Sequence, residues 1–375
     1  MRFLHTADWQ IGMRAAHVGA AGGRVREERL AAARRAVGQA RAAGAEFILV
    51  AGDTFEHNGV DRALVQKVGD ILAGFGGPVF VIPGNHDPLA PGSVWEHPVW
   101  NVSPQLRVLR DPAQVSVGEV DIFPCPLTEE HSRRDPTAWI SAAGSGRIRL
   151  GLAHGSLEGI ALDDLDYPIA RDAAERGGLD YLALGHWHSW ARFHGPDGVP
   201  RTAYSGTHET TRFGERDSGY VLLVEIVAPG AAPVITPLGA GGLCWQELPR
   251  ELRAPGDLGA LRGSLEALAS PDSTLVDVRL AGLLFAAEQG ELARVRELIG
   301  ARFLFGRLDE SGLRPAPEDD QWFERLPDGV LRETAVRLRV LADPSYQGPR
   351  REGATPEVAA QALMDLYKLA GEVGA

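Results

Sequence analysis

The chain has 375 residues, of which 44% are hydrophobic and 23% are charged, and its formal net charge is −12. This composition is typical of a globular protein that folds into about two or three domains around a sizeable core. The acidic balance argues against a protein that binds nucleic acid through its own basic surface. It leaves room for a nuclease whose carboxylates hold metal ions.

Cysteine usage and the first residues narrow the class further. Cys125 and Cys244 are the only cysteines, so we expect neither a disulfide framework nor a cysteine-based zinc site. The chain enters a strand-like run at once, without the pattern of a signal peptide. No apolar run approaches the roughly 18 residues of a membrane span. We therefore expect a cytoplasmic protein without a membrane partner.

The first 87 residues alternate between apolar strands and helices. Strands are predicted over 2–6, 47–50 and 78–82, and helices over 25–43 and 60–75. In the first helix the apolar residues recur on one face, and the arginines, Arg29 among them, fall mostly off that face. This β-α-β-α-β order predicts a parallel sheet covered by helices.

Polar residues follow each of these three strands. Asp8 and Gln10 follow the first strand, Asp53 follows the second, and the triplet 85–87 follows the third. The triplet alone, Asn-His-Asp, is equally typical of an ordinary turn, because Pro, Gly, Asn and Asp are common turn residues. However, the carboxyl ends of parallel strands meet at one edge of a sheet. This convergence favours a functional site over a plain turn.

Short apolar strands continue through the second part of the core. They are predicted over 108–109, 115–117, 120–123, 147–153, 179–184 and 220–227. His154 ends the fourth of these strands, and His186 and His188 follow the fifth. We expect the last strand to close a second sheet, and a Pro/Gly-rich break near 237–242 to end the core.

The chain is predicted to have three parts: a core over 1–242, a small α/β cap domain over 243–314, and a linker with C-terminal helices over 315–375. The cap lacks a polar constellation, which indicates a packing role. A helix predicted over 356–370 carries an apolar stripe. That stripe either packs on the chain's own fold or docks a partner, and both interpretations stay open.

The residues at the strand ends together form a mixed nitrogen and oxygen donor set. Its members are Asp8, Gln10, Asp53, Asn85, His154, His186 and His188. Such a set suits Mn²⁺, Fe²⁺ or Zn²⁺ better than Ca²⁺. Two metal ions about 3.5–4 Å apart, bridged by one carboxylate, can clamp the attacking and leaving oxygens of a phosphoryl displacement. The joint pattern therefore predicts two-metal hydrolysis of a phosphoester.

These motifs resemble the calcineurin-like metallophosphoesterase superfamily, and within it most closely the Mre11/SbcD nuclease family. The matching segments are 4–12, 51–55, 83–87, 184–188, 204–207 and 212–215. Gln10 stands where that family usually has a histidine. The resemblance implies an α/β fold, a four-layer α/β/β/α metallophosphoesterase sandwich with a small α/β cap domain and a C-terminal helical tail.

The resemblance also implies roles for the site residues. One metal ion would take Asp8, Gln10, Asp53 and His188, and the other would take Asp53, Asn85, His154 and His186. Gln10 stays open between ligand and spectator, because a neutral amide is a weaker donor than an imidazole. His86 would face the phosphate as a proton donor or charge stabiliser, and Asp87 would hold the His86 ring.

Three further residues receive narrower expectations. Arg212 is the arginine expected to contact a phosphate, although a surface salt bridge is a comparable interpretation. His5 is expected to be a hydrogen-bonded core residue. His208 stays open between a loop residue and a neighbour of the site.

By resemblance, the function is that of a Mn²⁺-dependent DNA nuclease, an exonuclease with room for endonuclease activity, in DNA repair or processing. Its partners would be DNA and an SMC-like ATPase of the Rad50/SbcC type, with a homodimer left open. The alternative is a stand-alone metallophosphoesterase that acts on nucleotides or other small phosphodiesters. A metal-depleted scaffold subunit is disfavoured by the nearly complete ligand set.

Overall fold

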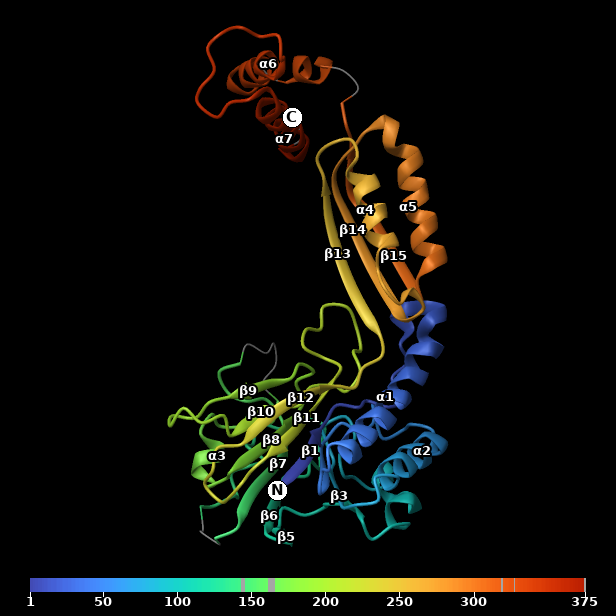
Figure 1. The fold of residues 1–375 in the computed structure, drawn as a ribbon, viewed down its shortest axis with the longest axis vertical. Helices are drawn as coiled ribbons and strands as arrows, with labels where there is room; N and C mark the ends of the chain where they lie inside the picture. The colour runs from blue at the N-terminus through green and yellow to red at the C-terminus, as the bar shows by residue number, and fades with distance from the viewer. Residues whose placement is uncertain (143–145, 161–165, 318–319, 327, 374–375) are drawn as a thin grey trace. The chain divides into compact units, whose positions relative to one another are not determined.

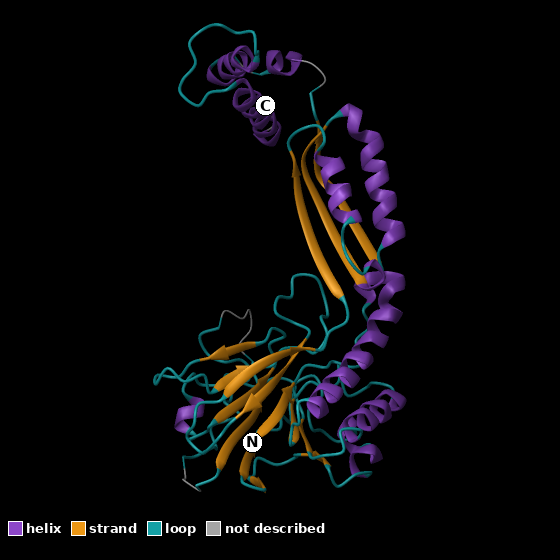
Figure 2. Ribbon diagram, in the orientation of Figure 1, coloured by secondary structure: helices purple, strands orange, loops and turns teal. Residues whose placement is uncertain are grey.

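The chain forms two compact units, Met1–Cys244 and Trp245–Ala375 (Figures 1 and 2). The computed structural model describes all residues except 143–145, 161–165, 318–319, 327 and 374–375. No helix among the described residues combines the length and the apolar character needed to cross a membrane.

The first sheet of the N-terminal unit has six strands in the order β12-β11-β1-β2-β3-β4. These are β12 (Val234–Gly239), β11 (Tyr220–Glu225), β1 (Arg2–Thr6), β2 (Phe47–Ala51), β3 (Val79–Ile82) and β4 (Leu106–Val108). Strands β1 to β4 are parallel, as the β-α-β-α-β pattern predicts, and Leu4 lies opposite Ile48. Strand β11 runs antiparallel to β1, so the prediction that 220–227 closes the second sheet is wrong.

The second sheet also has six strands, in the order β5-β6-β7-β8-β10-β9. These are β5 (Val115–Val117), β6 (Val120–Pro124), β7 (Ile148–His154), β8 (Tyr181–Gly185), β10 (Thr202–Tyr204) and β9 (Ala191–Phe193). Strands β6, β7, β8 and β10 are parallel, and the two edge strands are antiparallel to their neighbours.

Three apolar clusters hold these layers together. The first lies between the first sheet and helices α1 (Gly22–Ala42) and α2 (Arg62–Ala73), and the second lies between the two sheets. The third lies on the outer face of the second sheet, where α3 (Ala173–Arg176) packs. The predicted α/β class and its layered α/β/β/α sandwich are therefore confirmed.

Helix α1 contains one departure from its predicted face. Arg29 is only 1% exposed, although the apolar periodicity places it away from the core. The guanidinium is tolerated inside because backbone carbonyls of the site loops accept its hydrogen bonds, as described below. Helix α2 begins at Arg62, two residues later than predicted, and the Asp61 side chain caps it by accepting from the Ala63 amide at 2.7 Å.

The C-terminal unit contains a three-stranded sheet in the order β13-β14-β15. Its elements are β13 (Cys244–Leu252), α4 (Asp257–Glu266), β14 (Thr274–Leu284), α5 (Gln289–Arg302), β15 (Phe305–Pro315), α6 (Val330–Ala342) and α7 (Pro356–Val373). Strand β13 is absent from the prediction, because it is mostly exposed and its polar residues and Pro249 break the strand signal. Part of the apolar stripe of α7 packs inside this unit, where Leu363 and Ala370 belong to one cluster with Phe323 and Ala335, whereas Val358 at its start is 56% exposed.

Candidate metal centre

The ends of β1 and β2 are joined directly to one another by backbone hydrogen bonds. The Asp8 amide donates to the Gly52 carbonyl at 3.2 Å, and the Gln10 amide donates to the Asp53 carbonyl at 2.9 Å. The loops after both strands are thereby fixed side by side at the carboxyl edge of the sheet, where α/β folds bind their ligands.

Four of the predicted ligands have strained backbones. The φ angles are 53° at Asp8, 41° at Gln10, 49° at Asp53 and 112° at His186. Residues other than glycine rarely adopt such φ angles, and the strained backbone persists only where the surrounding structure holds it in place. Half of the eight non-glycine residues with positive φ in the described ranges therefore lie in this one site.

The turn after β3 passes so close to Asp53 that only glycine fits at position 84. A Cβ at Gly84 would lie 2.2 Å from Asp53 Oδ1 and 2.3 Å from the Asp53 amide nitrogen. The turn after β3 can approach the Asp53 loop only because hydrogen takes the place of that carbon. The turn then places Asn85 and His86 against Asp53, and the His86 amide donates to Asp53 Oδ1 at 2.9 Å.

Asp8, Asp53 and His154 form a buried cluster whose ligand atoms all lie within 4.8 Å of one another. His154 Nε2 is 3.2 Å from Asp53 Oδ2. Both carboxylate oxygens of Asp8 accept from the His186 amide, at 3.0 and 3.1 Å. The first and second sheets therefore contribute to one site.

Asn85 joins this cluster to the second sheet through its amide oxygen. His154 Nε2 lies 2.9 Å from Asn85 Oδ1, and His186 Nδ1 lies 3.1 Å from the same oxygen. Asn85, His154 and His186, together with Asp53, are the four predicted ligands of one metal ion. The structure brings all four together.

The contacts of His154 provide a test of whether a cation fits. Its Nδ1 lies 2.8 Å from the Ala51 carbonyl, which can only accept, so Nδ1 carries a proton. Its Nε2 then faces the oxygens of Asp53 and Asn85. A bare Nε2 and these oxygens are all acceptors, so a positive centre must lie between the nitrogen and the oxygens. A proton or a metal ion satisfies this need, and adjacent ligands about 2.1 Å from one ion lie roughly 3 Å apart. The donor set therefore fits a divalent ion.

The pKa values of the cluster agree with this interpretation. Burial lowers the pKa of His154, but the Asp53 charge and hydrogen bond outweigh burial and raise the pKa to about 9. Burial would raise the pKa of Asp53, but the His154 charge holds it below its usual range. Burial raises the pKa of Asp8 to about 6. In the absence of metal, a proton on His154 therefore takes the place of the cation.

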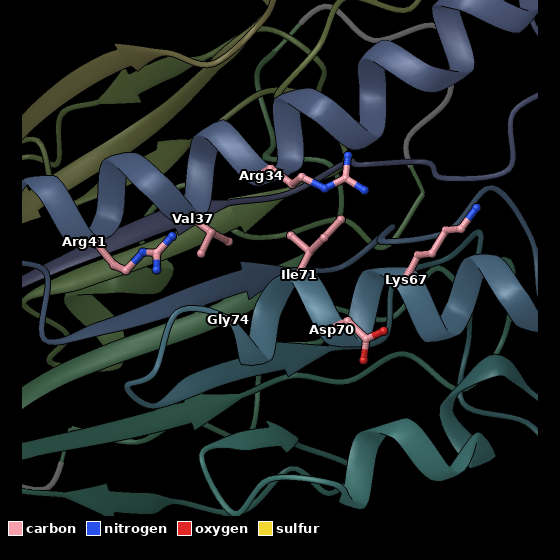
Figure 3. A pocket seen from close by; sticks show the side chains of 7 residues that line it. All are labelled: Arg34, Val37, Arg41, Lys67, Asp70, Ile71 and Gly74. Carbon is pink, nitrogen blue, oxygen red and sulfur yellow. The ribbon is translucent and has the colours of Figure 1, made fainter.

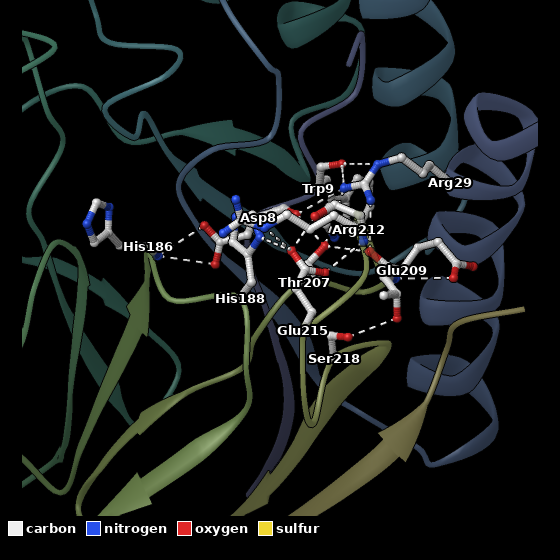
Figure 4. A network of polar contacts seen from close by, with 12 residues as sticks. Asp8, Trp9, Arg29, His186, His188, Thr207, Glu209, Arg212, Glu215 and Ser218 are labelled. Atoms are coloured by element: carbon white, nitrogen blue, oxygen red, sulfur yellow. Dashed lines mark hydrogen bonds and ion pairs between the residues drawn. The ribbon is translucent and has the colours of Figure 1, made fainter. Parts of the chain in front are cut away.

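His188 is held by Glu215, a carboxylate to which the sequence prediction gave no role (Figure 4). His188 Nδ1 lies 2.8 Å from Glu215 Oε1, and the Glu215 side chain is only 6% exposed. The amide of Thr211 donates to Glu215 Oε2 at 2.7 Å, and the Thr211 hydroxyl donates to Oε1. Carboxylates commonly orient the free nitrogen of a metal-binding histidine in this way. A signal existed, because Glu215 lies in the matched segment 212–215.

Arg29 supports the loop of Asp8 through its guanidinium (Figure 4). Its guanidinium donates to the Asp8 carbonyl at 3.3 Å, to the Trp9 carbonyl at 3.0 Å and to the Glu209 carbonyl at 2.8 Å. The Thr207 hydroxyl donates to the Asp8 carbonyl at 2.7 Å. Periodicity alone did not find Arg29, since it gives the face of a helix but not the carbonyls that lie opposite it.

The predicted contact between Asp87 and the His86 ring is wrong. The carboxylate of Asp87 accepts from the Gly84 amide at 2.7 Å and from the Phe55 amide at 2.9 Å. The His86 ring is exposed, and its Nδ1 lies 3.1 Å from the Glu56 carbonyl. Asp87 therefore fixes the turn between β3 and the site, while the Glu56 carbonyl orients the His86 ring.

The remaining predicted residues occupy distinct places. Gln10 lies at the same edge, 7% exposed, and its ligand role stays a prediction. Arg212 has a side chain that is 74% exposed, with Nε 3.7 Å from Glu215 Oε1. His5 is a core residue as expected, with Nδ1 2.9 Å from the Tyr181 hydroxyl. His208 is buried 5.1 Å from the Trp9 ring, and its Nε2 contacts the Arg29 carbonyl, so it packs behind the site.

Two open clefts meet at His186. One has a volume of about 680 Å³ and is lined by Asn85, Glu129 and Asp166 among others. The other has a volume of about 600 Å³, and His188 and Arg212 line it. Volumes of this size are typical of sites for small ligands. A substrate therefore has access to the centre from two sides.

One curated protein is similar to about half of this chain. The uncharacterized metallophosphoesterase YhaO of Bacillus subtilis is 26% identical over 211 residues, and the match covers 53% of this chain and 50% of that protein. The chain thus spans about half the length of this relative.

Two solved structures are similar to this chain at a low level. A crystal structure of a Thermus thermophilus protein has a TM-score of 0.41 at 12% identity and covers 64% of this chain and 98% of that one. A second solved structure has a TM-score of 0.43 at 12% identity and covers 63% and 98%.

The family model of the calcineurin-like phosphoesterases matches residues 1–190 of the 375-residue chain. This range contains Asp8, Asp53, Asn85, His154 and the histidines after β8. The chain belongs to the calcineurin-like phosphoesterase family.

Proposed function

We propose that this phosphoesterase is a Mn²⁺-dependent DNA nuclease that hydrolyses phosphodiester bonds with two metal ions. The observation that carries the proposal is the convergence of Asp8, Asp53 and His154 within 4.8 Å, with Asn85 and His186 beside them. The motif resemblance to Mre11/SbcD nucleases supports the choice of DNA as substrate.

The donor set divides between two metal positions. Asp53, Asn85, His154 and His186 would hold one ion, and Asp8, Asp53, Gln10 and His188 would hold the other. When bound, the two ions supply a hydroxide near neutral pH and neutralise charge on the phosphoryl oxygens. Mn²⁺ is proposed because a mixed set of imidazole, carboxylate and amide donors suits it.

His86 is proposed as the catalytic residue that meets the substrate. Its amide is fixed on Asp53 Oδ1, and its ring is exposed next to Asn85. The Glu56 carbonyl engages Nδ1, which leaves Nε2 as the nitrogen that can face a phosphoryl group. When protonated, this nitrogen can donate to the leaving oxygen or stabilise its charge.

The partners and the setting are part of the same proposal. An acidic protein with a net charge of −12 would gain from an SMC-like ATPase, or from a second copy, that adds grip on DNA. We place this activity in the cytoplasm, in DNA repair or processing. A stand-alone phosphodiesterase for nucleotides remains the alternative, because the same centre can serve a small substrate.

The test compares labelled single- and double-stranded DNA with bis-p-nitrophenyl phosphate in the presence of Mn²⁺. We expect cleavage of all three, and loss of roughly 10²–10⁴-fold in kcat for His86→Ala, the range of general acid catalysis. His194→Ala changes an exposed histidine outside the centre and is the matched control. Cleavage of the dye ester without DNA cleavage, even with the partner ATPase added, would leave the alternative in place of the nuclease.

A further inference from the structure

The cleft on the His188 side combines aromatic rings with arginines. Trp187, Trp190, Arg212 and Arg216 line it together with His188, and its volume is about 600 Å³. Both tryptophans are half-buried, and both arginines are exposed. Stacking faces next to cations are the two features by which proteins bind unpaired nucleic acid strands.

Each of the two tryptophan rings packs against an aromatic residue and a core cluster. Trp187 packs edge-on against Tyr204 with ring centroids 5.7 Å apart, and it joins the cluster on the outer face of the second sheet. Trp190 packs against Tyr220 at 6.5 Å and joins the cluster between the sheets. Each ring therefore has one part in the core and another part in the cleft, which keeps the stacking surface in place at little cost in entropy.

The arginines belong to a loop that is tied to the metal centre. Its residue Glu215 holds His188, and the Trp190 amide donates to the Asp217 carbonyl at 2.9 Å. The Glu215 carboxylate is turned inward, so it adds little negative charge to the cleft surface. Within the described part of the chain, Arg216 has no ion-pair partner and is available for an anion.

The second cleft that His186 lines has only one arginine, Arg133, and no tryptophan. It carries the carboxylates of Glu129 and Asp166, and Asp166 Oδ2 lies 2.9 Å from His131 Nδ1. Carboxylates repel the phosphates of a nucleic acid backbone, whereas arginines attract them. The cleft of the tryptophans is also lined by the exposed Asp217, but it has two arginines where the other cleft has one, Arg133. It alone of the two is lined by tryptophan rings, so it is the better match to a nucleic acid strand.

We propose that the cleft of Trp187, Trp190, Arg212 and Arg216 is a subsite for an unpaired nucleic acid strand beside the metal centre. Bases stack on the two tryptophans, and the flanking phosphates pair with the two arginines. An unpaired strand is required because the faces of paired bases are already covered by their neighbours. The inference rests on the proposed nuclease function and specifies which form of the substrate its site accepts.

The experiment measures binding of a fluorescent oligothymidylate by anisotropy, in chelator, so that catalysis plays no part. We expect Trp190→Ala to weaken binding by roughly five- to a hundred-fold, the contribution of one stacked base, and Trp190→Phe to keep most of the affinity. We expect Arg216→Ala to lower the slope of log affinity against log salt by roughly 0.7, the value of one phosphate contact.

The groove between α1 and α2 supplies the matched control (Figure 3). Arg34 lies over this groove of about 390 Å³, which contains none of the metal-centre residues, and its side chain is exposed like that of Arg216. Arg34→Ala should leave both the affinity and the salt slope as in the unaltered protein. An equal effect of Arg34→Ala and Arg216→Ala would mean that charge alone is responsible and would overturn the proposal.

Three further outcomes would also overturn it: no binding of the oligothymidylate, unchanged binding by Trp190→Ala, or preference for a duplex. If Trp190→Ala does not fold, as judged by its thermal melting, the exposed Arg216→Ala variant decides. Hydrolysis of bis-p-nitrophenyl phosphate with Mn²⁺ separates the two proposals. Hydrolysis without oligonucleotide binding removes the subsite alone, and binding without hydrolysis of any phosphodiester removes the nuclease function.

Discussion

Glu215 determines the orientation of His188 through a hydrogen bond to its ring. Because its carboxylate fixes the ring through Nδ1, Nε2 is the nitrogen left to bind metal. We expect Glu215→Ala to weaken the affinity of one Mn²⁺ ion by roughly 10–100-fold. Isothermal titration calorimetry measures this change directly. The exposed Glu297 of α5 gives the control variant Glu297→Ala, and equal affinities in the two variants would refute the positioning role.

His154 makes the stability of the metal-free protein decrease as the pH rises. Its pKa in the fold, about 9, lies above the ordinary 6.5 because Asp53 outweighs burial. Its stabilising contribution is therefore complete below pH 6.5 and is lost as the pH rises to 9. We expect the free energy of unfolding in chelator to fall across this interval, as urea titrations would measure.

Metal binding should have the opposite trend over the same interval. The proton on His154 must leave before a metal ion can bind at Nε2, so Mn²⁺ affinity should rise with pH and binding should release protons. Calorimetry in buffers of different ionisation enthalpy counts those protons. A flat affinity profile in this interval would show that His154 is not a ligand.

At the scale of single residues, the strand-end pattern predicted Asp8, Asp53, Asn85, His154 and His186 as neighbours, because parallel strands bring their ends together. It failed where a role depends on a partner that is distant in sequence. Glu215 contacts His188 and Arg29 contacts the Asp8 loop across gaps that no local pattern encodes.

The turn between β3 and the centre leaves no room for a side chain at Gly84. Gly84→Ala places a carbon 2.2 Å from Asp53 Oδ1, and Asp53 cannot move without leaving the cluster. We expect a loss of about 1–3 kcal/mol in stability, as for overpacked cores, and loss of Mn²⁺ binding. Thermal melting and calorimetry measure the two effects.

Gly38 in the middle of α1 is the matched control. A Cβ at Gly38 would meet no atom within 4 Å. Gly38→Ala should stabilise the protein by roughly 0.5–1 kcal/mol, because alanine loses less entropy than glycine in a helix. Similar destabilisation by both alanines would show that the tight approach at Gly84 is unimportant.

At the scale of elements, the prediction succeeded for the early strands and helices. It missed strands β9, β10, β12 and β13 and assigned β11 to the wrong sheet. The apolar runs of β1, β2 and β3 are buried on both faces, so their strand signal is unambiguous. Strand β11 was recognised, but a local pattern does not reveal its partner, β1. Strand β13 was missed because its exposed residues lack an apolar alternation.

At the scale of the whole molecule, the metal centre belongs to the N-terminal unit alone. All the predicted metal ligands, and both six-stranded sheets, lie within Met1–Cys244. We therefore expect a chain that ends at Cys244 to melt cooperatively and to bind Mn²⁺ as the full chain does, by calorimetry. A non-cooperative transition in the shortened chain would show that its folding depends on Trp245–Ala375.

The pairing of β1 with β11 sets an order of events during synthesis. Strand β1 is synthesised more than 200 residues before β11, yet Arg2 pairs with Glu225, and the Met1 amino group donates to the Ile226 carbonyl at 2.8 Å. At about 5–20 residues per second, β1 waits roughly 10–45 s for this neighbour. During that time its open edge invites pairing with other chains. A nascent chain of this protein should therefore depend on chaperones until β11 has emerged.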